Sequence, residues 1–299
     1  MDRSQLATEK RNPRSAKIDR LSTLGIVDLI NSEDRKVAGA VRRCRKEIAR
    51  AVEIIEEVWR TGGRLFYVGA GTSGRLGVLD ASECPPTFGS RPGMVQGVIA
   101  GGRRALVRSI EGAEDRREAG AEAMRKRRVG ARDVVVGIAA CGLTPYVLGA
   151  LGQARKAGAH TVFITCAPEA RARRVAEIVI NPVVGPEVIT GSSRMKAGTA
   201  TKLVLNTLTT AAMVRSGKVY GNLMVDLRAV NVKLNDRAER IVMTVTGVSR
   251  GGAHKLLKEA RGGAKAAIVM HLAGLSYAQA RRRLAARGGS LRRALERSR

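Results

Sequence analysis

The chain has 299 residues, 44% of them hydrophobic, which is enough for an α/β domain of about 200 to 250 residues and a small appendage. It contains no run of about 18 apolar residues, and its first residues lack the apolar stretch of a signal peptide, so we expect a cytoplasmic protein without a membrane partner. The net charge of +28 is scattered along the chain, and aromatic residues make up only 3%. This composition favours an anionic small-molecule ligand over nucleic acid.

The four cysteines do not form a metal-binding pattern. Cys44, Cys84, Cys141 and Cys166 include no C-x-x-C pair, and no histidine near them completes a metal set. We therefore expect reduced thiols and no metal ion.

Apolar periodicity predicts an alternation of helices and strands. Residues 33–60 show helical spacing that ends at Gly62-Gly63, and a strand-sized apolar run follows at 65–68. Further strand-sized runs lie at 95–99, 133–139, 161–165 and 177–180, with helical stretches at 74–82, 103–127, 145–158 and 168–176. This order predicts an α/β fold, a doubly wound parallel sheet with helices on both faces.

The last third of the sequence is helical. Residues 191–216 predict one long helix, and from about 235 to 299 helical runs alternate with Gly-rich turns, which predicts a small C-terminal bundle of three helices. The expected organisation is an N-terminal segment and helix packed on the core over 1–60, an α/β domain over 61–232, and a helical domain over 233–299.

Residues 69–74, directly after the first strand, form a Gly-rich turn that opens a helix. Free N–H groups and the helix dipole at such a turn attract an oxyanion, although a tight turn needs glycine even without a ligand. The turn lacks both the dinucleotide fingerprint and the lysine of a P-loop, which argues against a nucleotide.

Two further turns, at 137–145 and 190–196, also lead from an extended run into a helix and carry hydroxyl or cationic groups. The carboxyl ends of parallel strands share one edge of a sheet, so the three turns can converge around one phosphorylated ligand. This arrangement is typical of sugar isomerase domains.

Long motifs resemble the N-acetylmuramic acid 6-phosphate etherase family, within the sugar isomerase superfamily. They are GAGTSGRLGVLDASECPPT at 69–87, EGAED at 111–115, GSSRMKAGTATKL at 191–203 and KVYGNLMVD at 218–226, with shorter matches at 8–13 and 18–23. The resemblance covers essentially the whole chain. It implies cleavage of the D-lactyl ether at C3 of the sugar phosphate during cell-wall sugar recycling, without a cofactor, in a homodimer.

The resemblance assigns the catalytic pair to Glu83 and Glu114. Glu114 would abstract the C2 proton, and Glu83 would protonate the leaving lactate and later activate water. Burial or mutual repulsion would have to separate the pKa values of the two carboxyls. The residues alone, without the motif match, favour a structural role for both: Glu83 as a helix-end or turn carboxylate before two prolines, and Glu114 as a solvated charge.

The substrate-binding candidates come from the three turns. Thr72, Ser73 and Ser193 are expected to contact the phosphate and sugar hydroxyls, with Arg194 or Lys196 supplying charge, although each hydroxyl could merely cap a helix. The full set is Gly71, Thr72, Ser73, Cys141, Thr144, Ser192, Ser193, Arg194 and Lys196.

Cys141 departs from the family pattern, which has serine at that position. A thiol is a weaker donor than a hydroxyl, so the change is expected to weaken binding by about 1 to 3 kcal/mol, or roughly 5- to 150-fold.

Two other functions fit the same pattern. One is a sugar-phosphate isomerase on the same fold, which would abstract a C2 proton without expelling a C3 substituent. The other is a non-catalytic regulator that senses sugar phosphates, because glucokinase regulatory proteins share such turns.

Overall fold

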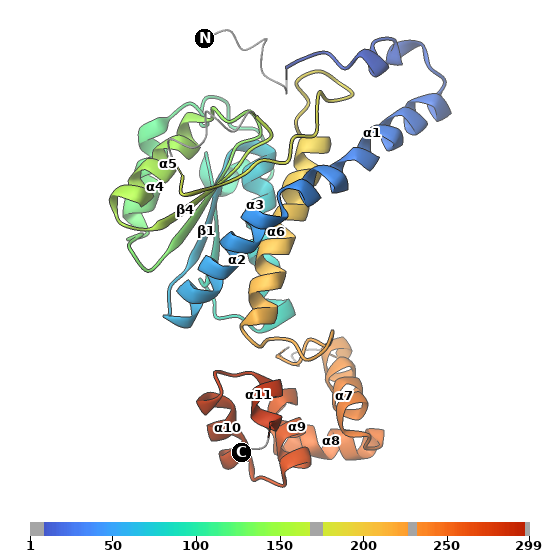
Figure 1. The fold of residues 1–299 in the computed structure, drawn as a ribbon, viewed down its shortest axis with the longest axis vertical. Coiled ribbons are helices and arrows are strands. Elements are labelled where there is room, and N and C mark those ends of the chain that lie inside the picture. Colours follow the sequence, from blue (N-terminus) through green and yellow to red (C-terminus); the bar gives the residue numbers. More distant parts are fainter. Residues whose placement is uncertain (1–8, 168–175, 227–231, 297–299) are drawn as a thin grey trace. The chain divides into compact units, whose positions relative to one another are not determined.

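The computed structural model describes residues 9–167, 176–226 and 232–296 (Figure 1). Contacts divide the chain into two units. The first unit comprises Met1–Ser82 and Gly93–Thr209, and the second comprises Glu83–Pro92 and Thr210–Arg299. The division differs from the expected boundaries in two ways: Glu83–Pro92 groups with the C-terminal helices, and the second unit begins at Thr210 rather than at 233.

A five-stranded parallel sheet forms the centre of the first unit. Its strands are β1 (Leu65–Gly69), β2 (Val95–Ile99), β3 (Val134–Ile138), β4 (His160–Ile164) and β5 (Ile178–Ile180), in the spatial order β2-β1-β3-β4-β5. Gly69 pairs with Ile99 on one side and Ile138 on the other, so these strands end in line. The predicted doubly wound sheet is confirmed. In this strand order the connection reverses between β1 and β3, where such folds bind ligands.

Helices cover both faces of the sheet (Figure 1). The residues of α4 (Arg117–Lys126) and α5 (Pro145–Lys156) share one apolar cluster with Phe66 and Val68 of β1. On the opposite face, Gly77 of α3 (Gly71–Phe88) lies against Tyr67. The Tyr67 side chain points to the other face of the sheet from those of Phe66 and Val68, because side chains alternate along a strand. Burial on both faces explains why the strands read as continuous apolar runs.

Two of the expected helices are interrupted or only partly helical. The helix expected over 33–60 is two helices, α1 (Thr23–Arg43) and α2 (Arg45–Arg60), which meet at Cys44. The helix expected over 103–127 is wrong for its first half: a short 3-10 turn over Gly102–Leu106 precedes an irregular loop, and α4 begins only at Arg117. The helix expected over 168–176 falls almost entirely outside the described residues.

The helix α6 (Lys196–Arg215), whose residues up to Thr209 belong to the first unit, begins five residues later than expected. Two short 3-10 turns, Pro13–Ser15 and Ile18–Arg20, precede α1.

The C-terminal helices of the second unit number five among the described residues, not the three that the sequence predicted. They are α7 (Val232–Thr246), α8 (Arg250–Glu259), α9 (Ala264–Ala273), α10 (Tyr277–Ala286) and α11 (Leu291–Leu295). They enclose their own apolar cluster, which includes Ile241, Leu257 and Ile268. Each is short because a turn with a capping serine or a glycine separates it from the next.

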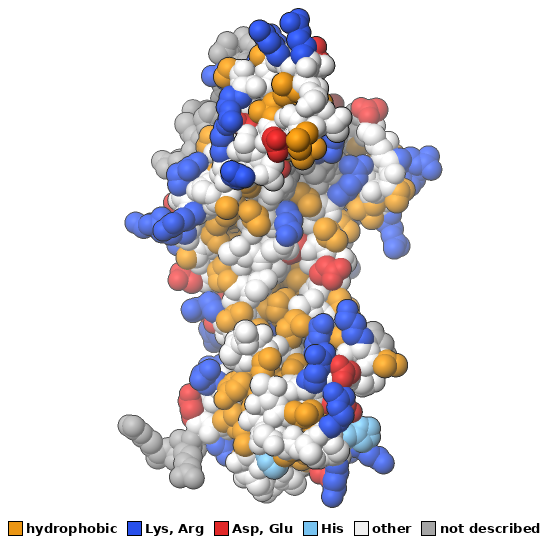
Figure 2. Space-filling view, turned by 90° about the vertical axis from the view of Figure 1, so that its right-hand side faces the viewer, with side chains coloured by type: hydrophobic (Ala, Val, Ile, Leu, Met, Phe, Trp, Pro, Cys, Tyr) orange, Lys and Arg blue, Asp and Glu red, His pale blue; other side chains and the backbone are white. Residues whose placement is uncertain are grey.

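On the face that Figure 2 shows, the Lys and Arg side chains are spread among acidic and apolar ones rather than gathered in one patch. Among the described helices, none combines the length and hydrophobicity that crossing a bilayer would require.

Candidate functional site

The turn after β1 brings a helix end to the edge of the sheet. A Cβ on Gly74 would lie 2.8 Å from the Gly69 carbonyl oxygen, and a Cβ on Gly69 would lie 2.6 Å from the Gly74 nitrogen. Only glycine fits at both positions, because the chain turns back on itself there. The first hydrogen bond of α3 runs from the Gly74 N–H to the Ala70 carbonyl, 3.2 Å. The preceding N–H groups therefore lack an intrahelical acceptor and, with the helix dipole, can bind an anion.

Four hydroxyls of the expected set remain available to a ligand. Thr72 and Ser73 at the first turn, and Ser192 and Ser193 at the third, are half-buried, and their hydroxyls bond to no other residue that the structure describes. Thr144 begins α5 without a capping hydrogen bond from its side chain. The alternative that these hydroxyls merely cap helices thus finds no support at these five positions.

A cavity of about 160 Å³ lies between the first turn and the loop after β2. Its lining includes Ala70, Gly71, Arg75, Ser109, Glu111 and Glu114. Glu114, which is exposed, therefore shares one cavity with the start of α3. The EGAED motif and the Gly-rich turn, 40 positions apart in the sequence, meet at the carboxyl edge of the sheet.

The loop that carries Glu114 is fixed by backbone contacts from two helices. The Arg75 guanidinium of α3 donates to the carbonyls of Leu106 and Arg108, at 3.1 and 3.3 Å. The Tyr146 N–H at the start of α5 donates to the Glu114 carbonyl, 2.9 Å. These contacts hold the loop in a non-helical path, although its charged composition resembles that of a helix.

The second turn, after β3, packs against the end of β4. The Cys166 N–H donates to the Ala140 carbonyl at 3.0 Å, and the Thr165 hydroxyl donates to the same oxygen at 3.3 Å. Cys141 is half-buried and its thiol is free of any disulfide. It lies on the same edge of the sheet as the first turn.

The third turn lies beside the first. A Cβ on Gly198 in α6 would be 3.5 Å from Cγ2 of Thr72 and 3.6 Å from the Ser193 carbonyl oxygen. Arg194 is exposed there. Within the first unit, the structure thus brings together the first turn, the third turn and Glu114.

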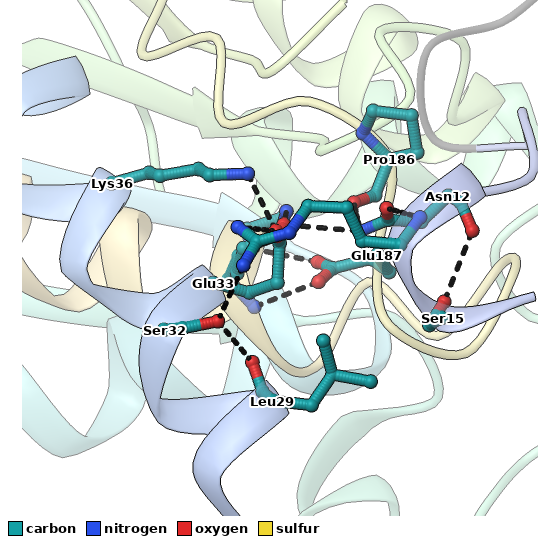
Figure 3. A network of polar contacts seen from close by, with 11 residues as sticks. Asn12, Ser15, Leu29, Ser32, Glu33, Lys36, Pro186 and Glu187 are labelled. Carbon is teal, nitrogen blue, oxygen red and sulfur yellow. Dashed lines mark hydrogen bonds and ion pairs between the residues drawn. The ribbon is translucent and has the colours of Figure 1, made fainter. Parts of the chain in front are cut away.

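Lys196 is not open to a ligand, contrary to the expectation that it supplies charge to the substrate. Its Nζ lies 2.7 Å from Oε2 of Glu33, and both side chains are 1% exposed. Glu33 also accepts hydrogen bonds from Asn12 at 3.0 Å and Lys36 at 2.5 Å (Figure 3), and from Arg14 at 3.0 Å. Lys196 is therefore the buried partner of an N-terminal carboxylate, and exposed Arg194 is the accessible cation of the third turn.

The cations around Glu33 keep it ionised. Burial alone would raise its pKa, but hydrogen bonds from Lys196 and Lys36 and the charge of Lys196 outweigh that effect and lower the pKa to about 2. The pair joins α1 to the start of α6, two helices far apart in the sequence.

Glu187 occupies the N-terminus of α6. Its carboxylate accepts the N–H groups of Lys196 and Ala197, at 3.0 and 2.9 Å, and the residue is 1% exposed. Sequence reasoning missed Glu187 and Glu33. Glu187 precedes α6 by nine residues, which is too far for the N-cap pattern to identify it, and Glu33 sits in a run of charged residues that gives no such signal.

Glu83 lies on α3, is exposed, and belongs to the second unit, whereas Glu114 belongs to the first. It is followed by Cys84 and by Pro85 and Pro86, which lie inside the helix.

Comparison with known proteins identifies relatives along nearly the whole chain. Residues 47–155 match the family described as the glucokinase regulatory protein N-terminal SIS domain. The N-acetylmuramic acid 6-phosphate etherase of Photorhabdus laumondii is 53% identical over 289 residues, covering 97% of this chain and 96% of the relative. N-acetylmuramic acid 6-phosphate etherase 2 of Vibrio parahaemolyticus is 54% identical over 295 residues, covering 99% and 98%.

A solved phosphoheptose isomerase from Francisella tularensis has a similar fold at 16% identity, with a TM-score of 0.49, covering 65% of this chain and all of that one. The sequence relatives are far closer and span both units. On that identity and coverage, the chain belongs to the N-acetylmuramic acid 6-phosphate etherase family.

Proposed function

We propose that this protein is a carbon–oxygen lyase that cleaves the D-lactyl ether at C3 of N-acetylmuramic acid 6-phosphate, giving N-acetylglucosamine 6-phosphate and D-lactate. The observation that carries the proposal is the cavity in which Glu114 meets the anion-binding turn of α3. The relatives named as etherases, at 53 and 54% identity, support the same substrate.

The chemistry is an elimination followed by addition of water. In the open-chain sugar the C1 aldehyde makes the C2 proton acidic, and Glu114 removes it as the C3–O bond breaks. Glu83 donates its proton to the departing lactate oxygen. Glu83, now a carboxylate, then takes a proton from water as the hydroxide adds to C3, and Glu114 returns a proton to C2.

The two carboxyls need different protonation states before the reaction begins. Glu83 enters the reaction as the acid and Glu114 as the base, and both side chains are exposed.

The phosphate is proposed to bind at the first turn. The free N–H groups of α3 and the hydroxyls of Thr72 and Ser73 supply donors, with Thr144, Ser193 and Arg194 contributing from the neighbouring turns. The net charge of +28 favours an anionic substrate at long range. Because this charge is dispersed, we propose no nucleic-acid partner.

We also propose a cytoplasmic homodimer. Leu24 and Val27 of α1 are 70% and 56% exposed, which supports a role for this helix in self-association. The helices α2 and α6 are the further candidates for the interface.

Lactate release from N-acetylmuramic acid 6-phosphate by the purified protein tests the function. We expect D-lactate and N-acetylglucosamine 6-phosphate in equal amounts, and loss of both with Glu83→Ala. An isomerase would convert sugar phosphates without releasing lactate, and a regulator would bind them without turnover. A wild-type protein that releases no lactate contradicts the proposal.

A further inference from the structure

The segment that carries Glu83 is the weakest part of α3. Pro85 and Pro86 lack N–H groups, so the carbonyls of Ala81 and Ser82 lose the donors that a helix supplies four residues later. The turn around Glu83 is therefore held by fewer helical hydrogen bonds than the rest of α3. Its position depends on contacts from outside the helix.

The contact on the far side of the prolines comes from Asp226. Gly89 follows the last residue of α3 with φ of +58°, and a Cβ there would lie 2.2 Å from the Asp226 carbonyl oxygen. The Gly89 N–H also closes the final turn onto the Pro85 carbonyl, 3.0 Å. The end of α3 and the backbone of Asp226 are thus in direct contact, with no room for a side chain between them.

Asp226 is itself held by two lysines. Its Oδ2 accepts from Nζ of Lys218 at 2.5 Å and lies 3.1 Å from Nζ of Lys265, the second residue of α9. The Lys265 ammonium also donates to the Gly289 carbonyl at 2.7 Å, and its side chain is 9% exposed. Burial lowers the pKa of Lys265, while the charge of Asp226 acts against that lowering. One buried ammonium therefore connects α9, the 289 turn and Asp226.

The loop that ends at Asp226 is fixed along its length. A Cβ on Gly217 would be 2.8 Å from Cα of Ser290, and the Arg292 guanidinium lies 5.1 Å from the centre of the Tyr220 ring. This loop is the KVYGNLMVD motif, for which the sequence suggested no role. Because both of its ends contact the C-terminal helices, it transmits their position to the end of α3.

We propose that Lys265 is a positioning residue for Glu83, acting through Asp226 and the end of α3. The inference rests on the proposed function and gives the C-terminal helices a part in it. These helices position the general acid, Glu83. The loop that carries the base, Glu114, is instead held within the first unit by Arg75 and α5. The two proton transfers are thus supported by separate parts of the chain.

The proposal separates two steps that can be measured independently. A general acid must reach the leaving oxygen at hydrogen-bond distance, and misplacement by about 1 Å costs about 100-fold in rate. Removal of the C2 proton does not require that alignment. A misdirected Glu83 should therefore slow lactate release while exchange of the C2 proton with solvent continues.

The experiment uses Lys265→Met in the full chain, with Lys258→Met, an exposed lysine of the same unit, as the matched control. Lactate release and uptake of deuterium at C2 of unconsumed substrate are followed together in D2O. We expect Lys265→Met to lower kcat for lactate about 100-fold with KM changed by about twofold or less, and with deuterium uptake retained. Lys258→Met should behave as wild type.

Asp226→Asn gives a second test, because it removes the charge but keeps the size and a hydrogen-bond acceptor. We expect the same pattern, with a smaller loss of about tenfold in kcat for lactate release. If Lys265→Met does not fold, Asp226→Asn provides the deciding measurement. Equal loss of lactate release and deuterium uptake, or no loss in a folded variant, would overturn the proposal. Failure of the wild-type protein to release lactate would instead contradict the proposed function.

Discussion

The N-termini of α3 and α6 follow similar Gly- and Ser-containing turns, but only one of them is open. At α3 the first N–H groups have no intrahelical acceptor and border the cavity that Glu114 lines. At α6 the corresponding groups are occupied by the Glu187 carboxylate, and the lysine that opens the helix is paired with Glu33. A turn that resembles an anion site can therefore be satisfied by the protein's own carboxylates.

This difference assigns distinct tasks to the two turns. The first offers backbone donors and a helix dipole to a phosphate, whereas the third offers only side chains, because its helix end already carries a negative charge. Substitutions at the N-terminus of α3 and at the N-terminus of α6 test this difference separately.

The largest expected effect concerns the N-terminus of α6, which the protein's own carboxylate occupies. Glu33→Gln should lower the free energy of unfolding by about 3 to 5 kcal/mol, because it leaves the buried Lys196 ammonium without a counterion. Denaturant unfolding measures the loss. Adding Lys196→Met to Glu33→Gln removes the orphaned charge and should recover part of the stability. A double variant no more stable than Glu33→Gln would show that the pair does not hold α1 to α6.

The same pair predicts how stability depends on pH. The folded-state pKa of Glu33 is about 2, below its ordinary 4.5, so its contribution is present above pH 4.5 and is lost as the pH falls toward 2. The corresponding change in the free energy of unfolding is about 3 kcal/mol, and Glu33→Gln should remove it. Glu57 is the matched control: the hydrogen bond from Arg60 lowers its pKa too, but this pair is exposed to solvent, so Glu57→Gln should change the acid profile far less.

The next largest effect concerns the N-terminus of α3, where the first N–H groups have no intrahelical acceptor. Ser73→Ala should lower kcat/KM for lactate release by about 10- to 150-fold, the cost of one hydrogen bond to a charged group. Ser193→Ala should cost about fivefold or less, because the Glu187 charge disfavours a phosphate close to α6. Thr244→Ala, at an exposed hydroxyl of α7, serves as the control. Equal losses at Ser73 and Ser193 would remove the distinction between the two turns.

The smallest effect is at Cys141. Cys141→Ser should raise kcat/KM by about fivefold, at the low end of the range for a neutral donor, since Thr144 offers a hydroxyl three residues later. Cys141→Ala should change kcat/KM by about twofold or less, because a thiol donates weakly. An unchanged kcat/KM in Cys141→Ser would mean that position 141 contributes no donor to the phosphate.

The sheet and the first turn were predictable because their signals are local. The apolar run at 95–99 has the same bounds as β2. The glycines of the first turn indicate the tight bend that Gly69 and Gly74 form. The loop over 107–116 was mistaken for helix, since its composition favours helix while its path is set by Arg75 and Tyr146, which are distant in sequence. The Gly-rich turns correctly indicated breaks between the C-terminal helices, but they led to a prediction of three helices where the described residues form five.

The candidate site was predicted only in part, for the same reason. Thr72, Ser193 and Glu114 belong to motifs, and the topology of parallel strands brings such motifs to one edge. Nothing local to Lys196 indicates that its partner is Glu33, or that Glu187 fills the helix end beside it. A buried charge is defined by its counterion, and here that counterion lies in another part of the chain.

The Glu33–Lys196 pair also bears on the order in which the protein folds. Its two residues are 163 positions apart, and every strand of the sheet lies between them. Closing so long a loop is costly until the intervening sheet has formed, so the pair belongs among the late contacts of a refolding chain. The third turn would then take its final shape after the sheet, and enzymatic competence would return later than secondary structure.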